Sequence, residues 1–181
     1  PPHSPRPNWP KRSRIMADNE LFPLVDPEGR VIGSATRRHC HSGSMLLHPV
    51  VHLHVFAPDG SLLLQKRSDD KDIQPGRWDT SVGGHVDFGE TIDLALRREA
   101  SEELGLVGFE TRPLAPYIFQ SAIERELVNP FIAVVDKSYP FRFQREEISE
   151  IAFWTRNEIL AAIGSGTLTP NFEQEYTRLL K

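Results

Sequence analysis

The sequence contains a single cysteine, Cys40, and no apolar run long enough to cross a membrane. One thiol cannot form an intrachain disulfide or a cysteine-based zinc site. A membrane-spanning helix needs about 18 consecutive apolar residues, and the N-terminal segment also lacks the apolar stretch of a signal peptide. These absences exclude a disulfide scaffold and an integral membrane protein, and we expect a cytoplasmic location.

Acids are absent from the first fourteen residues, which hold Arg6, Lys11, Arg12 and Arg14, whereas acids outnumber bases in the rest of the chain. The net charge of the chain is −4, so removing these four positive charges leaves −8 for the remainder. A folded body with that balance is not typical of a nucleic-acid-binding protein. The 39% hydrophobic and 25% charged residues are ordinary for a globular domain of this length.

The chain divides into a short leader and one domain. Residues 1–15 combine five prolines with basic residues, which predicts a flexible leader, with an arm docked on the body as the alternative. Residues 16–181 predict a single domain without internal repeats. Its first predicted elements are a hairpin over 20–35 turned at 26–29, a helical turn at 36–41, and strands at 50–56 and 62–66 joined by a turn at 58–60. The segment 78–86 should lead into the box helix, and strands at 114–123, 131–135 and 151–155 and helices at 157–163 and 172–180 follow.

Three glutamates share one face of a predicted helix within the segment REASEELG. Glu99, Glu102 and Glu103 stand at i, i+3 and i+4, so their carboxylates lie within about 5–6 Å of each other. They continue an apolar stripe that begins with Ile92 and Leu96. A solvated acidic face is the alternative. Because like charges at this spacing destabilise a helix, and because carboxylates are preferred ligands of Mg²⁺ and Mn²⁺, we expect a divalent metal here.

The segment from Gly84 to Leu106 resembles the Nudix box, G-x5-E-x7-R-E-U-x-E-E-x-G-U, where U is an aliphatic residue. The fixed positions are matched by Gly84, Glu90, Arg98, Glu99, Ala100, Glu102, Glu103, Gly105 and Leu106. The resemblance implies an α/β/α sandwich with a mixed central sheet and a loop–helix–loop metal site that hydrolyses diphosphates. It implies that Glu99, Glu102 and Glu103 bind Mg²⁺ or Mn²⁺. The Gly84 carbonyl is a further candidate ligand, and Glu90 and Arg98 are implied to support the glutamates.

Residues 21–160 also resemble the isopentenyl-diphosphate isomerase branch of the Nudix superfamily. This resemblance implies a second metal site or polar cluster, made by His41, His48, His85, Glu124 and Glu126. Two departures point away from isomerisation. Gly83 stands where the isomerases carry a proton-transferring cysteine, and glycine has no titratable side chain. The box is complete here, whereas it is degenerate in the isomerases.

Several other polar positions have two interpretations each. His52 and His54 alternate with apolar residues on a predicted strand, where a hydrogen-bonded or half-exposed histidine is more common than a metal ligand. Lys66 and Arg67 end a strand and either contact phosphate or are simply solvated. Trp78 either packs under the box helix or stacks on a substrate ring, and packing is the more common outcome.

Together these patterns predict metal-assisted hydrolysis of a phosphoanhydride bond. Bound metals would lower the pKa of a water, and a glutamate would accept its proton. Glu103 is the first candidate base, and the loop with Glu146, Glu147 and Glu150 is the second. The predicted partner is a small-molecule diphosphate whose attached group is left open, with no nucleic acid or membrane and with a homodimer as an open option. An isomerase and a catalytically silent ligand-binding module are the alternatives.

Overall fold

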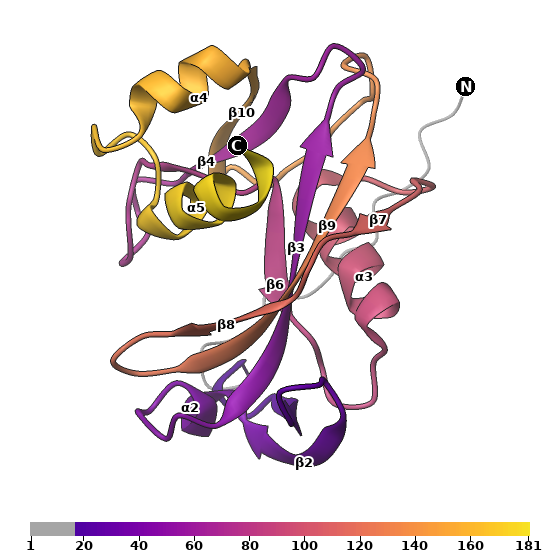
Figure 1. Cartoon of the computed structure of the whole chain (residues 1–181), viewed down its shortest axis with the longest axis vertical. Helices are drawn as coiled ribbons and strands as arrows, with labels where there is room; N and C mark the ends of the chain where they lie inside the picture. Colours follow the sequence, from indigo (N-terminus) through magenta and orange to yellow (C-terminus); the bar gives the residue numbers. More distant parts are fainter. Residues whose placement is uncertain (1–16) are drawn as a thin grey trace.

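The computed structural model describes residues 17–181, so the predicted leader at 1–15 lies outside the described residues (Figure 1). A mixed sheet forms the middle layer. Helix α3 (Ile92–Leu104) covers one face, and helices α4 (Arg156–Ala162) and α5 (Pro170–Glu175) lie on the other. This is the α/β sandwich that the sequence predicted. None of the helices in residues 17–181 is long and apolar enough to cross a membrane.

Eight strands make up the central sheet: β3 (Leu47–Phe56), β4 (Leu62–Arg67), β5 (Trp78–Asp79), β6 (Val82–His85), β7 (Arg112–Pro113), β8 (Tyr117–Gln120), β9 (Arg125–Val134) and β10 (Ile148–Trp154). β3 pairs in parallel with β9 along its whole length. Its other edge is shared, because β6 pairs with residues 50–53 and β4 pairs only at Phe56. The sheet therefore splits at this edge of β3, where β6 and β4 pair with different parts of the strand. The candidate site lies at this split between β6 and β4.

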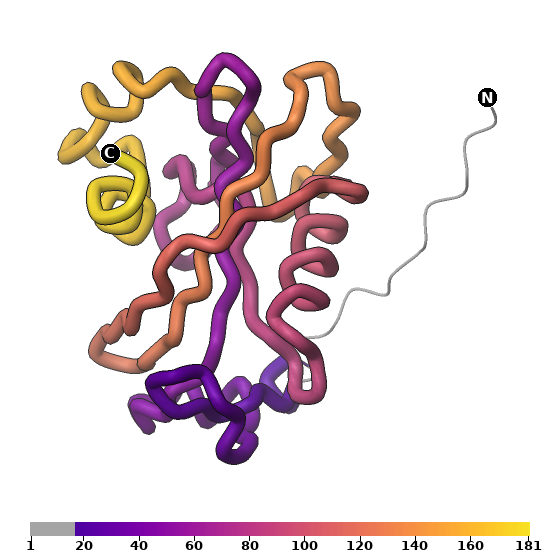
Figure 2. The backbone as a smooth tube through the Cα atoms, turned by 45° about the vertical axis from the view of Figure 1, so that its right-hand side comes forward, coloured from indigo at the N-terminus to yellow at the C-terminus, as the bar shows by residue number. Residues whose placement is uncertain are grey.

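A separate hairpin, β1 (Leu21–Val25) and β2 (Val31–Thr36), lies at one end of the sheet and leads into α2 (Arg37–Cys40), as the indigo segment of Figure 2 shows. Its turn is held by Asp26, whose carboxylate accepts the backbone N–H groups of Glu28 and Arg30. The Thr36 hydroxyl caps α2 by accepting the N–H of His39. The predicted hairpin and helical turn are both confirmed.

Side-chain alternation along the strands divides the core between the two helical layers. On β3, Val51, Leu53 and Val55 are fully buried in the cluster that α3 joins. On β4, Leu63 belongs to the same cluster, while Leu62 and Leu64 face the opposite way. That second cluster contains Ile159, Leu168, Phe172 and Tyr176. The even-numbered residues of β3 therefore point away from α3, toward the α5 side.

Several predicted boundaries were wrong. The strand predicted at 131–135 is the ten-residue β9, which begins at Arg125 and continues through Pro130, a residue usually confined to edge strands and bulges. Pro130 is tolerated because it lies between the residues of β9 that pair with β8 and those that pair with β7. The segment 78–86 leads into α3 as predicted and contains the short strands β5 and β6, while the strand predicted at 114–123 is only β8. The turn at 58–60 forms, but its two strands pair at one position. The last helix begins at Pro170 and continues as the π-helix η1 (Tyr176–Leu180).

Candidate active site

The box helix α3 starts and stops where its local sequence dictates. The Thr91 hydroxyl accepts the N–H of Leu94 at 3.1 Å and caps the N-terminus. Gly105, with a φ of 63°, ends the helix in the left-handed conformation that glycine adopts without strain. The acidic half of the helix is thereby held at a fixed place beside β6.

Arg98 fastens the loop that precedes α3 to the helix itself. Its guanidinium donates to both carboxylate oxygens of Glu90, at 2.8 and 2.9 Å, and to the carbonyl of His85 at 3.0 Å. Glu90 also accepts the N–H of Asp87 at 2.8 Å. The hydrogen bonds that Arg98 donates to Glu90 raise the pKa of Arg98, which is charged at every accessible pH. The predicted pairing of Glu90 and Arg98 is therefore present in the structure.

Glu99 lies directly against the backbone of β6 at Gly84. A Cβ atom at Gly84 would lie only 2.2 Å from the Glu99 Cδ, so no residue larger than glycine fits without moving this carboxylate. Burial raises the pKa of Glu99 to about 7, although the neighbouring Arg98, 2.8 Å away, opposes that shift. Gly84 thus creates the space in which the Glu99 carboxylate sits.

Glu103 fills the split between β4 and β6. Its carboxylate accepts the side-chain amide of Gln65 on β4 at 3.0 Å and the backbone N–H of Gly83 on β6 at 3.2 Å. Burial and the nearby Glu99 raise the pKa of Glu103 well above its usual value. Glu102 is exposed at the rim, 3.4 Å from Arg98. The structure therefore gathers Glu99 and Glu103 at Gly83–Gly84, with Glu102 beside them.

The predicted histidine cluster lies on the other face of β6. Successive side chains of a strand point to opposite faces, so Gly84 faces α3 while the ring of His85 faces away. Each residue of the set His41, His48, His85 and Glu124 offers a ligand atom within 4.8 Å of those of the others. The His41 Nε2 lies 3.0 Å from a Glu124 oxygen. These four predicted residues converge in space.

The protonation of these histidines suits metal binding. His48 directs its Nδ1 to the carbonyl of Leu46 at 3.0 Å, and its buried Nε2 has no hydrogen-bond partner within residues 17–181. Burial lowers the pKa of His48 and of His85, so both rings are neutral near pH 7. A neutral ring with a buried, unpaired nitrogen lone pair offers a ready ligand for a metal ion.

Two further side chains border this cluster. Glu126 is hydrogen-bonded to Glu124, and burial together with that neighbouring carboxylate raises the pKa of Glu126 to about 8. Phe22 of the N-terminal hairpin stacks on His85 with ring centroids 4.6 Å apart. The hairpin therefore covers part of the cluster, in which His48 is buried and His41 and His85 are half-buried.

The other candidate residues have structural partners. The Arg67 guanidinium donates to the carbonyl of Ile73 at 3.0 Å, while Lys66 lies on β4 next to it. Trp78 packs against Trp154 with ring centroids 5.3 Å apart, in the cluster formed with α4 and α5. The expectation that it packs under the box helix was wrong, because α3 covers the opposite face of the sheet.

In the second candidate loop for the base, Glu147 is ion-paired with Lys71. Glu146 is exposed, and Glu150 is an exposed residue of β10.

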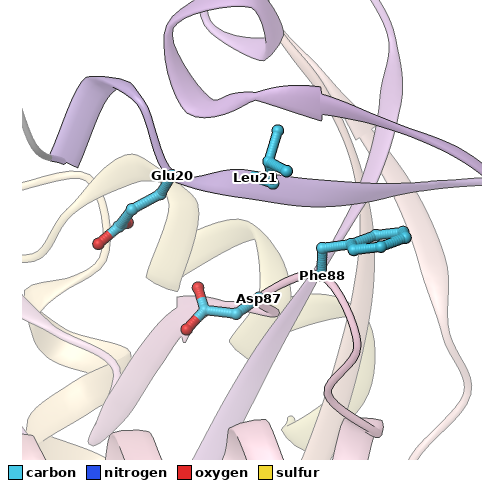
Figure 3. A pocket seen from close by; sticks show the side chains of 4 residues that line it. All are labelled: Glu20, Leu21, Asp87 and Phe88. Atoms are coloured by element: carbon cyan, nitrogen blue, oxygen red, sulfur yellow. The ribbon is translucent and has the colours of Figure 1, made fainter.

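A hollow of about 330 Å³ lies between β1 and the loop after β6, lined by Glu20, Leu21, Asp87 and Phe88 (Figure 3). The carboxylates of Glu20 and Asp87 both border it. Each lies near an arginine: a Glu20 oxygen is 4.0 Å from Arg37, and an Asp87 oxygen is 3.7 Å from Arg98.

Sequence reasoning missed Glu175, a carboxylate on α5 that is only 1% exposed. It accepts hydrogen bonds from His52, His54 and Tyr117. His52 and His54 are therefore hydrogen-bonded histidines, which is the first of the two interpretations that the sequence allowed. One signal was available, since Glu175 stands three residues after Phe172 and therefore on the apolar face of its helix.

Comparisons with known proteins agree with this architecture. The NUDIX domain family matches residues 46–172. An uncharacterized Nudix hydrolase of Yersinia pestis is 31% identical over 170 residues, which cover 88% of this chain and 92% of that protein. Another, from Pseudomonas aeruginosa, is 34% identical over 140 residues, or 77% and 81% of the two chains.

Two solved structures are also similar. A Deinococcus radiodurans protein has a TM-score of 0.75 at 28% identity, and the match covers 90% of this chain and all of that one. The NUDIX domain of Shewanella oneidensis NrtR, solved with ADP ribose, has a TM-score of 0.54 at 20% identity, covering 72% and 85%.

The fold, the box helix and these matches define a class of protein. The chain belongs to the Nudix family and is a hydrolase of that family. The isomerase and the silent binding module are the less favoured alternatives.

Proposed function

We propose that this hydrolase requires a divalent metal and cleaves a phosphoanhydride bond in a diphosphate linked to another moiety, such as a nucleoside diphosphate derivative. The supporting observation is the pair of half-buried carboxylates, Glu99 and Glu103, packed against the backbone of Gly83 and Gly84. Two acids with raised pKa values at one point are costly unless a cation compensates them.

The donor set fits Mg²⁺ or Mn²⁺. Glu99, Glu102 and Glu103 would hold the ion, with the Gly84 carbonyl as a further oxygen ligand, because hard divalent cations prefer carboxylate and carbonyl oxygens. When bound, such an ion neutralises diphosphate charge and lowers the pKa of a coordinated water.

The remaining chemistry belongs to the side chains of the chain. Glu103 accepts a proton from the attacking water, and its orientation is set by Gln65 and the Gly83 N–H. Arg98 positions the Glu99 carboxylate, and Glu90 holds Arg98 in place. Because the Arg98 guanidinium is already occupied by these acceptors, its role is to support the carboxylates rather than to bind the diphosphate.

The histidine cluster is the second metal site in this proposal. Imidazole nitrogens from His41, His48 and His85 with a carboxylate oxygen from Glu124 suit a transition metal such as Mn²⁺ or Zn²⁺ better than Mg²⁺. Glu126 is the adjacent carboxylate. The Nε2 of His48, which has no hydrogen-bond partner among residues 17–181, supports this assignment over a purely hydrogen-bonded cluster.

Isomerisation of prenyl diphosphates lacks a proton donor here. A Cβ atom at Gly83 would lie 3.4 Å from Cδ2 of the His52 ring, and glycine offers no acid there. Cys40 is buried on α2, outside that position. We expect no catalytic incorporation of solvent deuterium into isopentenyl or dimethylallyl diphosphate, and such incorporation would move the chain to the isomerase class.

The test is phosphate or nucleotide release from a mixed panel of diphosphates with Mg²⁺ or Mn²⁺. Glu103→Gln keeps the shape and removes the charge, so the best turnover should fall by roughly 10³-fold or more while the protein stays folded. Glu110→Gln is the matched control, because Glu110 is exposed just beyond the box. A Glu103→Gln enzyme that is nearly as active as the control would overturn the metal and base assignment.

A further inference from the structure

Ser81 lies where the β3–β4 hairpin stops pairing. Next to the turn, the Ala57 N–H donates to the Ser61 carbonyl at 2.8 Å. Hydrogen-bonded positions alternate along an antiparallel pair, so the next bond of this ladder would run from the Val55 N–H to the Leu63 carbonyl. In the described part of the chain the two strands instead pair at a single position. The fully buried side chain of Ser81 takes the place of that next bond.

The Ser81 hydroxyl bridges the two strands at this point. Its oxygen accepts the N–H of Val55 on β3 at 3.0 Å, and it donates its proton to the carbonyl of Leu63 on β4 at 2.5 Å. Both residues are buried, so both backbone groups need a partner. Two hydrogen bonds through a hydroxyl span a wider gap than one direct bond. Ser81 therefore holds β3 and β4 apart and still satisfies both backbones.

A longer hairpin would compete with β6 for the edge of β3. The same register would bring Gln65 of β4 opposite Leu53 of β3. In the structure, the partner of Leu53 is Val82, the first residue of β6. The two pairings exclude each other, and Ser81 stands at the point where β4 gives way to β6. The split between β4 and β6 therefore begins at Ser81.

The backbone of Ser81 reaches the proposed base. Its carbonyl accepts the side-chain amide of Gln65 at 3.0 Å. The same nitrogen of Gln65 donates to Glu103 Oε1, also at 3.0 Å. The other oxygen of Glu103 accepts the N–H of Gly83, two residues after Ser81. Both contacts that orient the Glu103 carboxylate therefore lead back to the segment that Ser81 fixes between the strands.

We infer that Ser81 is a positioning residue for the proposed hydrolysis. Its hydroxyl fixes the split between β4 and β6, and its carbonyl fixes Gln65, so that Glu103 is held in the orientation that accepts a proton. The inference rests on the proposed function, in which Glu103 is the base. Ser81 is buried away from the substrate and acts through these contacts alone.

Ser81→Ala tests the inference, because it removes the hydroxyl with little change in volume. We expect kcat on the best diphosphate to fall about 10- to 100-fold and KM to stay within about threefold, since a displaced catalytic group slows the reaction without removing a binding contact. Ser61→Ala is the matched control. Ser61 is a buried serine of the same hairpin, whose hydroxyl donates to Asp59 within the turn at 2.6 Å, and its variant should keep the wild-type kcat.

Two further variants separate the path of action from stability. Ser81→Cys carries a weaker hydrogen-bonding group, so it should lose kcat in the same direction but to a smaller extent, and it replaces the alanine variant if that protein does not fold. Gln65→Leu breaks the same path at its second step. If both residues act on Glu103 in series, the Ser81→Ala/Gln65→Leu double variant should have a kcat no lower than the worse single variant.

NMR of the metal-free protein gives a readout that does not depend on turnover. The side-chain amide of Gln65 reports on its bonds to Ser81 and Glu103. Its resonance should shift in Ser81→Ala and stay in place in Ser61→Ala. A serine that only stabilised the hairpin would lower the melting temperature without shifting this resonance and without changing kcat.

Each outcome decides the inference. A folded Ser81 variant with the kcat of Ser61→Ala, or with an unshifted Gln65 resonance, overturns it. Losses of kcat that multiply in the double variant also overturn it, because Ser81 and Gln65 would then act independently. The proposed function fails by a different result, a Glu103→Gln enzyme with wild-type activity. An inactive Glu103→Gln enzyme beside a fully active Ser81→Ala enzyme contradicts this inference alone.

Discussion

Replacing Gly84 with alanine should damage the active site much more than the fold. The new Cβ would lie 2.2 Å from the Glu99 Cδ and 2.4 Å from its Oε1, whereas ordinary contacts begin near 3.4 Å. The carboxylate must therefore move by about 1 Å. The atoms in the way belong to the end of a flexible side chain, so we expect a stability loss in the usual range for overpacking, about 1–3 kcal/mol. A functional group displaced by 1 Å costs about 10²-fold in rate.

The measurement pairs kcat/KM on the best substrate with thermal unfolding. Gly83→Ala is the control, because its Cβ would meet the His52 ring at an ordinary 3.4 Å and would not reach Glu99. A double-mutant cycle with Glu99→Gln completes the test. If both substitutions act through the same carboxylate, the double variant should be no less active than the worse single variant.

Two results would refute this reasoning. A Gly84→Ala enzyme with kcat/KM close to that of Gly83→Ala would mean that the position of Glu99 does not matter for turnover. Additive losses in the cycle would mean that Gly84 acts by another route, such as the path of the β6 backbone.

Three further predictions concern the supporting residues. Arg98→Lys cannot reproduce the two bonds to Glu90 and the bond to the His85 carbonyl, so the melting temperature should fall by roughly 2–8 °C and the activity about tenfold or more. An Arg98→Lys variant with the melting temperature and activity of the wild type would contradict this. His48→Gln should remove one equivalent of Mn²⁺ or Zn²⁺ in a calorimetric titration and leave the glutamate site, and unchanged stoichiometry would count against the second metal site. Glu175→Gln should destabilise the protein by about 3 kcal/mol at pH 7. Because folding lowers the pKa of Glu175 from its usual 4.5, its stabilisation is complete above that value and is lost as pH falls through the lower folded pKa. The two unfolding curves should therefore converge at acid pH, and a constant gap would argue against the carboxylate's role.

The arrangement within the box could be predicted because it depends on local geometry. Helical spacing places Glu99, Glu102 and Glu103 on one face whatever the rest of the chain does. The boundaries of α3 also follow from nearby residues, Thr91 and Gly105. Only the burial of the carboxylates required the tertiary structure, since it comes from the contact of α3 with β6.

The partners of β3 could not be predicted in the same way. Its main neighbour is β9, joined in parallel from Leu47 to Phe56 with a partner about eighty residues later. A turn signal at 58–60 suggested a hairpin instead. The turn exists, but the hydrogen-bonding edge of β3 was already occupied by β6. Pairing over such distances is decided by the competition among strands, which no short window of sequence contains.

Glu175 illustrates a second limit. A carboxylate one residue before Tyr176 near the end of the chain is ordinarily assigned to solvent. It is buried where His52 and His54, on the even-numbered face of β3, direct their ring nitrogens at its carboxylate. The signal therefore lies in two segments together, an alternating pair of histidines and an acid on an apolar helical face, and neither segment alone indicates the contact.

The two candidate metal sites are joined by one peptide unit of β6. Gly84 faces Glu99 on α3, and His85, the next residue, points to the opposite face and enters the histidine cluster. Arg98 adds a second link, because it donates to the His85 carbonyl while it holds Glu90 and Glu99. A shift of β6 at either site is transmitted to the other by the backbone itself. The pair of residues Gly84–His85 therefore carries both proposed sites, and a substitution at one of them is expected to alter metal affinity at both.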